Sequence, residues 1–187
     1  MQVTETFFTV NGLTFQIRSA RETDAQALSA LRFKIDGETE FLDREQGEAF
    51  IDEDGFKQII REDTEKKRHL FLVAVVREEI VGFSRCEGSP LKRFAHKVEF
   101  GIAIRKDYWG YAIGRHLLTA CIHWADTQQI KKMALHVLET NQKAIRLYEQ
   151  HGFEIEGLLK NDKVLSDGRF YHTVVMGRHN QIDSCIK

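Results

Sequence analysis

One segment in the second half of the chain combines small residues with a basic residue at a predicted junction between a strand and a helix. Residues 98–105 (VEFGIAIR) have the composition of a strand, and an amphipathic helix begins near Ile113. The first N–H groups of a helix have no partner within it and lie at the positive end of its dipole, so they attract phosphate. The small residues Gly110, Ala112 and Gly114 would let a diphosphate approach the main chain. The segment therefore predicts a phosphate-binding turn, or else an ordinary turn that needs glycine only for its conformation.

A second segment, residues 135–153, places a polar cap and a tyrosine on one predicted helix. Asn141 stands where the helix starts, and Tyr148 follows seven residues later, which is about two helical turns. Asn141, Ala144 and Tyr148 thus share one face of this helix. Taken alone, the pattern also fits a plain N-cap at Asn141 and a half-buried core residue at Tyr148.

The elements that position these segments follow from hydrophobic periodicity. Asn11-Gly12 predicts a type I′ turn between two short strands, and helical spacing after a cap at Thr23 or Asp24 predicts the first helix. A polar loop over residues 37–48 precedes a second helix. The remaining predicted elements are strands at 70–76, 80–87 and 98–105, a helix from 113, a strand at 133–138, a helix at 144–151 that ends at Gly152, and strands at 153–159 and 170–176. This order predicts an α+β domain with a mixed central sheet.

Composition limits the class of protein. The 187 residues, 42% of them hydrophobic, are enough for one domain, which we place over residues 1–187 with a core at about 13–178. The 27 Lys and Arg against 28 Asp and Glu argue against a nucleic-acid partner. The three cysteines lack metal-ligand spacing, and the chain shows neither a signal peptide nor an apolar run long enough for a membrane span. These features predict a cytoplasmic protein with reduced thiols.

Together the two segments resemble the GNAT acetyltransferase superfamily. Its motif N-x-x-A-x-x-x-Y-x-x-x-G-F is matched in full by residues 141–153. Its diphosphate motif Q/R-x-x-G-x-G/A is matched less well, since Trp109 stands at the Q/R position and Ala112 at the first glycine, while Gly114 matches the last. Residues 156–160 and 167–176 resemble the branch that contains ribosomal-protein N-terminal, spermidine and amino-acid N-acetyltransferases. In many of these relatives an acidic residue stands where this chain has His172, and Asp167-Gly168 also fits a simple hairpin turn.

The resemblance implies a fold, a co-substrate and a set of contacts. The fold would have a mixed sheet of about seven strands and about four helices, with an extra N-terminal strand. Acetyl-CoA would be the co-substrate, and no metal is expected. The residues that would hold the coenzyme are Ala103 and Ile104 through their backbone, Trp109, Gly110, Tyr111, Ala112, Ile113, Gly114, Arg115, Asn141 and Ala144.

The resemblance also implies direct attack of an amine on the thioester. Glu99 would be the base, acting directly or through water, although it also fits a surface or ion-paired residue. Tyr148 would be the acid at the departing sulfur, and Gly101 would allow a bulge or a splay that opens the sheet.

The acceptor and the rival functions stay open at the level of sequence. Acidic residues crowd residues 36–53, which suits a cationic acceptor such as a polyamine or a peptide N-terminus, or else a solvated loop. An amino acid is also a candidate acceptor, and the family allows for a homodimer. Neither Cys121 with His123 nor His116 with His123 has the spacing of a cysteine enzyme or a zinc site. The main rival is a GNAT-like module that binds coenzyme A or a partner protein without catalysing transfer.

Overall fold

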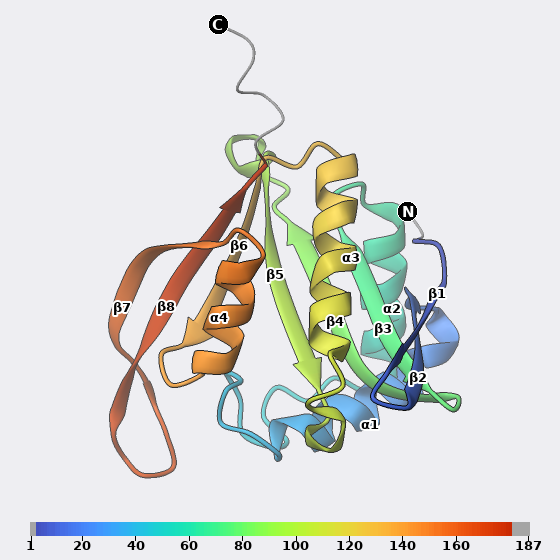
Figure 1. Ribbon diagram of the computed structural model, residues 1–187, viewed down its shortest axis with the longest axis horizontal. Coiled ribbons are helices and arrows are strands. Elements are labelled where there is room, and N and C mark those ends of the chain that lie inside the picture. The colour runs from blue at the N-terminus through green and yellow to red at the C-terminus, as the bar shows by residue number, and fades with distance from the viewer. Residues whose placement is uncertain (1–2, 181–187) are drawn as a thin grey trace, which may run out of the picture.

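The computed structural model describes residues 3–180, which form one eight-stranded sheet with helices on both faces (Figure 1). The strands are β1 (Thr6–Val10), β2 (Leu13–Ser19), β3 (Leu70–Val76), β4 (Glu79–Gly88), β5 (Lys97–Ile104), β6 (Lys132–Leu138), β7 (Glu154–Val164) and β8 (Phe170–His179). The α-helices are α1 (Ala25–Asp36), α2 (Glu53–Glu65), α3 (Ile113–Thr127) and α4 (Gln142–Gln150). The predicted α+β class and mixed sheet are confirmed.

The strands lie in the order β1-β2-β3-β4-β5-β6-β8-β7, and only β5 and β6 are parallel neighbours. The β5–β6 ladder runs only from Lys97↔Lys132 to Glu99↔Ala134, although β5 continues to Ile104. The two strands therefore separate after Glu99. The β4–β5 register is unbroken through Gly101, so the sheet opens by a splay on the β6 side and not by a bulge.

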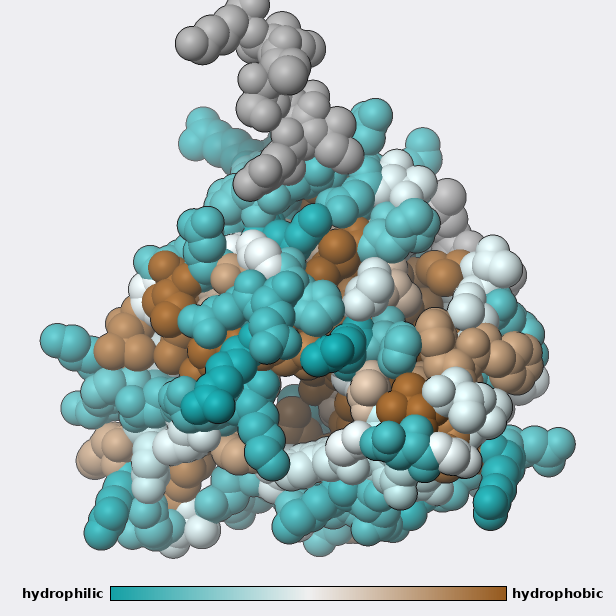
Figure 2. Space-filling model, in the orientation of Figure 1, coloured by the Kyte–Doolittle hydropathy of each residue, from teal (hydrophilic) through white to brown (hydrophobic). Residues whose placement is uncertain are grey.

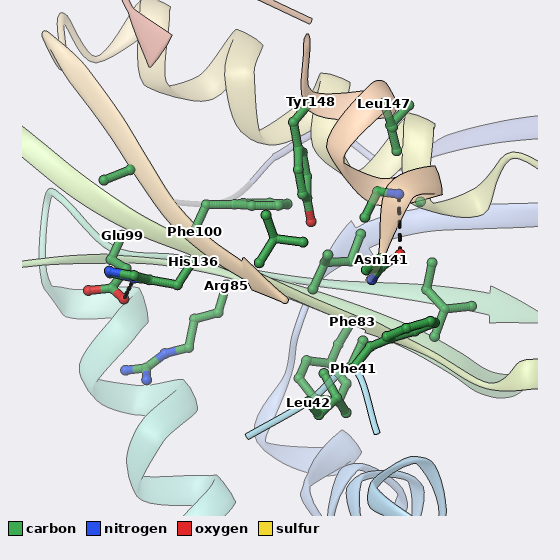
Figure 3. Close-up of a pocket in the computed structure, with 18 of the residues that line it drawn as sticks. Phe41, Leu42, Phe83, Arg85, Glu99, Phe100, His136, Asn141, Leu147 and Tyr148 are labelled. Carbon is green, nitrogen blue, oxygen red and sulfur yellow. Dashed lines mark hydrogen bonds and ion pairs between the residues drawn. The ribbon is translucent and has the colours of Figure 1, made fainter. Parts of the chain in front are cut away.

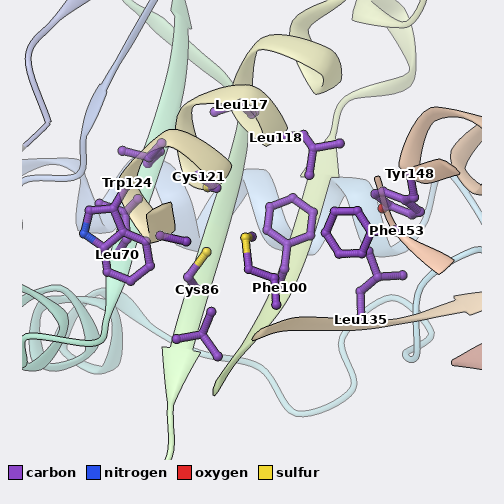
Figure 4. Close-up of a cluster of buried hydrophobic side chains, with 14 of the residues drawn as sticks. Leu70, Cys86, Phe100, Leu117, Leu118, Cys121, Trp124, Leu135, Tyr148 and Phe153 are labelled. Atoms are coloured by element: carbon purple, nitrogen blue, oxygen red, sulfur yellow. The ribbon is translucent and has the colours of Figure 1, made fainter. Parts of the chain in front are cut away.

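Helices on both faces give the protein two apolar cores. Strand β3 is almost continuously apolar because it is covered on both sides. Its Leu70 and Leu72 join the core under α3 and α4, whereas Phe71 and Val73 join the core under α1 and α2. Figure 4 shows the first of these cores, where side chains of α3 and α4 pack over the middle of the sheet.

Local turns follow the predicted chemistry with one difference. Asn11 and Gly12 have φ angles of 51° and 79°, as a type I′ turn requires, and Gly152 ends α4 with φ 82°. Asp24 occupies the N-cap position of α1 but does not cap it. Its carboxylate accepts instead from the Arg21 N–H at 2.8 Å and from Arg18 at 2.7 Å. Of the residues described, no helix is both long and apolar enough to cross a membrane.

Candidate active site

The separation of β5 and β6 lies over a cavity of about 1360 Å³ that is lined from both faces of the sheet. Tyr148 and Leu147 of α4 line it on one face, and Arg85, Glu99 and His136 line it on the other (Figure 3). Figure 2 shows a hollow on the α3–α4 face, with hydrophilic side chains around its rim and hydrophobic ones inside it. The cavity exceeds the size usual for a drug-like ligand, so it suits a long one.

The backbone of β5 supplies polar groups to this opening. The Arg105 N–H donates to the Val81 carbonyl at 2.9 Å, and groups of an antiparallel strand alternate in direction. The N–H and C=O of Ala103 therefore face β4, while those of Ile102 and Ile104 face the split. This direction favours Ile102 and Ile104 over Ala103 as backbone donors to a ligand in the split, although the Ala103 side chain also lines the cavity.

The turn before α3 has the conformation of an anion-binding site. Gly110 has φ 88° and Ala112 has φ 57°, and Ala112 is the N-cap of α3 without a side-chain hydrogen bond to the helix. Among residues 3–180 the first-turn N–H groups of α3 therefore have no side-chain acceptor, and they lie at the positive end of the helix dipole. Trp109, Gly110, Ala112, Ile113, Gly114 and Arg115 line the cavity, whereas Tyr111 packs against the core.

Two of these residues also have structural roles that the motif does not reveal. A Cβ atom at Gly114 would come within 3.2 Å of Ile104 Cδ1, so glycine here lets α3 approach β5 closely. The Trp109 indole N–H donates to the Ile104 carbonyl at 2.9 Å, and its ring stacks on Phe41 at 6.4 Å between centroids. Trp109 thus joins the turn to β5 and to the loop that follows α1.

Three cations from α3 and α4 also line the cavity. Arg115 lies in the first turn of α3, and Lys143 and Arg146 lie on α4. Within residues 3–180 none of them forms a salt bridge. Cations without a protein partner beside unsatisfied helix N–H groups fit a diphosphate, so the residues present suit coenzyme A.

Helix α4 brings the predicted residues together at the cavity. The Asn141 side chain accepts from the Ala144 N–H at 3.3 Å, which is the N-cap that its residue type predicts. Asn141, Ala144 and Tyr148 all line the cavity. The shared face expected from the spacing is therefore present.

Tyr148 is more deeply buried than predicted. Its ring is 7% exposed and packs against Phe100 and Phe153, at centroid distances of 6.3 Å and 5.7 Å. Burial raises the pKa of its phenol to about 12, so the hydroxyl stays protonated at neutral pH. In Figure 3 the hydroxyl points from α4 into the cavity. The group can therefore donate a hydrogen bond or a proton there.

Glu99 lies on the opposite face of the sheet, beside a histidine. Its Oε1 atom is 3.2 Å from His136 Nδ1, and both side chains are accessible. Nearby, Arg85 donates to the buried Asp63 of α2 at 2.6 Å and to Glu87 at 2.8 Å. The Asp63 carboxylate also accepts from His69 at 2.8 Å. The Arg85 side chain is therefore held in place by two carboxylates where it lines the cavity.

The acidic loop after α1 uses most of its carboxylates within the protein. Glu38 accepts from the Lys106 N–H, Glu40 accepts from the Ser166 N–H, and Asp43 pairs with Lys163. The further pairs are Asp36 with Arg44, Glu48 with the Glu45 N–H, Asp52 with the Gly55 N–H, and Glu53 with Lys57. These bonds tie the loop to the turn before α3 and to the β7–β8 hairpin. A carboxylate that accepts a backbone N–H keeps its negative charge, and Glu40, Glu48 and Asp52 are exposed, so the loop remains acidic.

In the part of the chain that the structure describes, the thiols and the other histidines do not form a second centre. Cys86 and Cys121 are fully buried, burial raises the pKa of Cys86, and Ser84 Oγ lies 3.3 Å from Cys121 Sγ. His116 packs against the ring of Phe8 at 4.0 Å. No group of three or more potential metal ligands lies together in the described part of the chain, and Cys185 is outside that part.

The sequence prediction missed the side chains that complete the cavity, namely His136, Lys143, Arg146, Arg85 and Phe41. One available signal was alternation in β6, where His136 is a polar residue between the apolar Leu135 and Val137. That pattern shows which face His136 occupies. Only the pairing of β6 with β5 shows that this face holds Glu99.

Comparison with known proteins finds acetyltransferases. The model of the acetyltransferase (GNAT) family matches residues 35–153. L-amino acid N-acetyltransferase of Escherichia coli is 27% identical over 111 residues, which cover 57% of this chain and 66% of the relative. A probable spermine N(1)-acetyltransferase of Bacillus subtilis subsp. natto is 40% identical over 57 residues, covering 30% and 38%. The matches thus span less than two thirds of either curated relative.

Solved structures extend the likeness to nearly whole chains. A GNAT-family acetyltransferase of Streptococcus pneumoniae is 27% identical, with a TM-score of 0.85 over 88% of this chain and 98% of that one. A putative acetyltransferase of Salmonella typhimurium, solved with its cofactor acetyl-CoA, has a TM-score of 0.81 over 92% and 98%. At 18% identity the second likeness shows the fold alone.

Proposed function

The chain belongs to the acetyltransferase (GNAT) family, and from this premise we propose that it transfers the acetyl group of acetyl-CoA to a primary amine by direct attack. The observation that carries the proposal is the cavity through the split sheet. The start of α3, which lines the cavity, has the features of an anion site, and the hydroxyl of Tyr148 and the carboxylate of Glu99 line the cavity on opposite faces of the sheet.

Acetyl-CoA supplies the activated thioester, and the chain's own residues bind and orient it. The first-turn amides of α3 together with Arg115, Lys143 and Arg146 would hold the diphosphate. The N–H groups of Ile102 and Ile104 face the split, where they can bond the pantetheine arm. This arrangement would direct the thioester towards the point where β5 and β6 meet.

Two side chains then handle protons. Glu99 provides the carboxylate through which the site takes up the ammonium proton, directly or through an intervening group. Tyr148 donates its hydroxyl proton to the departing sulfur. Its raised pKa keeps it in the donor form, and a thiolate in the same desolvated pocket gains basicity from the same effect.

The acceptor is a primary amine of a small molecule or of a peptide N-terminus. The relatives include an amino-acid and a spermine acetyltransferase, so both classes belong in a test. Polyamines also test the loop after α1, because its carboxylates keep their negative charge where they accept backbone N–H groups. Opposite α4, the cavity is walled by the apolar Phe41, Leu42 and Phe83.

The direct test measures release of free thiol from acetyl-CoA in the presence of amino acids, polyamines and short peptides. We expect release that depends on the amine and exceeds a control without amine. Binding of acetyl-CoA by calorimetry without amine-dependent release for any member of the panel would instead favour a module that only binds the coenzyme.

A single substitution tests the role of Tyr148. Tyr148→Phe keeps the ring and its packing but removes the proton donor, so turnover should fall by about 10²- to 10⁴-fold, the usual contribution of a general acid. The dissociation constant for acetyl-CoA should change little. Turnover equal to that of the wild type would remove Tyr148 from the proposed mechanism.

A further inference from the structure

Glu99 and His136 meet across the two strands that separate to form the cavity. Glu99 pairs with Ala134 in the last step of the β5–β6 ladder, and His136 lies two residues further along β6 on the same face. The position that would face His136 on β5 is Gly101, where an added Cβ would meet no atom within 4 Å. The imidazole therefore borders an open space at the point where the strands diverge.

The contact between the two side chains fixes which imidazole nitrogen can accept a proton. An ionised carboxylate only accepts hydrogen bonds, so His136 Nδ1, 3.2 Å from Glu99 Oε1, must carry the hydrogen. His136 Nε2 then holds the free lone pair. Within residues 3–180 this nitrogen has no hydrogen-bond partner.

The other charged groups that face this region already have partners. Arg85 of β4 is held by Asp63 and Glu87, and Lys132 of β6 is held by Glu156 of β7. In the loop after α1, Asp43 pairs with Lys163 and Arg44 with Asp36. Lys97 at the start of β5 lies over the Phe94 ring. The neighbour of His136 on β8 is the uncharged Val175.

We infer that His136 is the catalytic base of the proposed acetyl transfer and that Glu99 is its positioning residue. The inference rests on the proposed function and names the group through which the Glu99 carboxylate acts. Glu99 holds the imidazole in the tautomer that exposes Nε2 and stabilises the positive charge that the ring gains. A histidine suits the task because it changes charge near neutral pH.

The proton balance of the step is complete. His136 Nε2 takes one proton from the acceptor ammonium, and the amine lone pair then forms the C–N bond at the thioester carbonyl. The C–S bond breaks, and its electron pair leaves with the sulfur, which takes the Tyr148 hydroxyl proton. The second proton of the attacking nitrogen returns to Tyr148, and the imidazolium releases its proton to water. One ammonium and one thioester thus give one amide, one thiol and one proton.

Kinetics with His136→Gln and Glu99→Gln test the assignment. His136→Gln should lower kcat by about 10²- to 10⁴-fold near neutral pH and leave the KM for acetyl-CoA unchanged. The loss should shrink as pH rises, because the acceptor amine then arrives already deprotonated. His179→Gln is the matched control, since His179 also pairs with a carboxylate, Glu156 at 3.1 Å, but does not line the cavity.

A measurement without substrate tests the tautomer. Nitrogen-15 spectra of the imidazole rings should show His136 as the Nδ1–H tautomer in the wild type. In Glu99→Gln the amide can donate to Nδ1, so the Nε2–H form should gain population. The Glu99 variant should therefore lose turnover through the same ring that the His136 variant removes, and the double variant should be little worse than His136→Gln alone.

Two results would overturn the inference. A His136→Gln enzyme with the wild-type kcat and pH–rate profile, beside an impaired Glu99→Gln enzyme, would make the carboxylate itself the base. An Nε2–H tautomer in the wild type would do the same. Absence of amine-dependent thiol release in the wild type is a different outcome, because it rejects the proposed transfer itself.

Discussion

The hydroxyl of Tyr148 lies at the boundary between the core and the cavity, so this residue belongs to both. Its ring fills space between Phe100 and Phe153, and its oxygen points towards the split (Figure 3). The spacing from Asn141 was enough to predict the helix face. It was not enough to predict the burial, because Phe100 comes from strand β5 and the contact depends on how α4 packs against the sheet.

The raised pKa of Tyr148 has a consequence for stability. Its phenol has a pKa of about 12 in the folded protein against about 10 in the unfolded chain, so only the unfolded state ionises between these values. The contribution of this group to the free energy of unfolding is therefore fully present below pH 10. It falls by about 2–3 kcal/mol as the pH rises to 12. Tyr148→Phe should lack this loss. Chemical unfolding of both proteins at pH 7, 10 and 11.5 checks it, and parallel curves would contradict it.

His136 marks the limit of prediction for single residues. Its place in a strand and its polar character are readable from the alternation of Leu135, His136 and Val137. Its relation to Glu99 is not, because the two residues are 37 positions apart and meet only through the parallel β5–β6 ladder. Sequence periodicity indicates which face of its strand a residue occupies. It does not indicate which strands are neighbours, because the strand order is a property of the whole fold.

At the scale of elements, the start of α3 carries a local cost that serves the site. Ala112 adopts φ 57° and ψ 13°, a left-handed conformation that is unfavourable for a residue with a Cβ. The sequence showed that alanine stands where the family motif has glycine, and the structure shows that the backbone keeps the glycine-like conformation. The conformation directs the turn so that α3 begins at the cavity.

Ala112→Gly should therefore stabilise the protein. Relief of the left-handed strain is partly offset by the greater freedom of glycine in the unfolded chain, which leaves a gain of up to about 1 kcal/mol in the free energy of unfolding. Ala120→Gly is the control within the same helix, where glycine should cost about 1 kcal/mol. Denaturant unfolding measures both. Equal destabilisation by the two substitutions would show that position 112 is not strained.

Helix α2 supports the site on the face of the sheet that carries Arg85 and Glu99, through one buried carboxylate. Asp63 is 2% exposed and binds both Arg85 of β4 and His69, whose other ring nitrogen lies 3.0 Å from the Gly88 carbonyl. The sequence predicts this helix after the polar loop of residues 37–48, from the apolar residues Phe56, Ile59 and Ile60. The ion pair was not predicted, since Asp63 resembles any charged residue of a surface helix in the sequence.

Asp63→Asn should destabilise the protein strongly, although the substitution changes the side-chain volume little. The substitution keeps the shape but leaves Arg85 without its buried counter-charge, at a cost of roughly 3 kcal/mol, the lower end for a broken buried ion pair because Arg85 is partly exposed. Glu87→Gln removes the other, exposed partner of Arg85 and should cost less than about 1 kcal/mol. If urea unfolding gave similar values for both variants, the buried pair would not be a main support.

At the scale of the whole molecule, the cavity lies where two parts of the sheet are least connected. Strands β1 to β5 and strands β6 to β8 share only the short ladder between Lys97–Glu99 and Lys132–Ala134. On the cavity side the loop after α1 adds bonds to the β7–β8 hairpin through Asp43 and Lys163 (Figure 1). A ligand that fills the split would contact both parts and so should stabilise their association.

Hydrogen exchange at single amides can test whether acetyl-CoA occupies the split. In the free protein the N–H groups of Ile102 and Ile104 face the opening, whereas the N–H of Ala103 bonds to β4. Added acetyl-CoA should slow exchange at Ile102 and Ile104 and leave Ala103 slow throughout, an alternating response along one strand. Global stabilisation alone would instead slow the most protected amides across the whole sheet. Uniform protection along β5, or none, would place the pantetheine arm outside the split, and the three unpaired cations would then need a different ligand path.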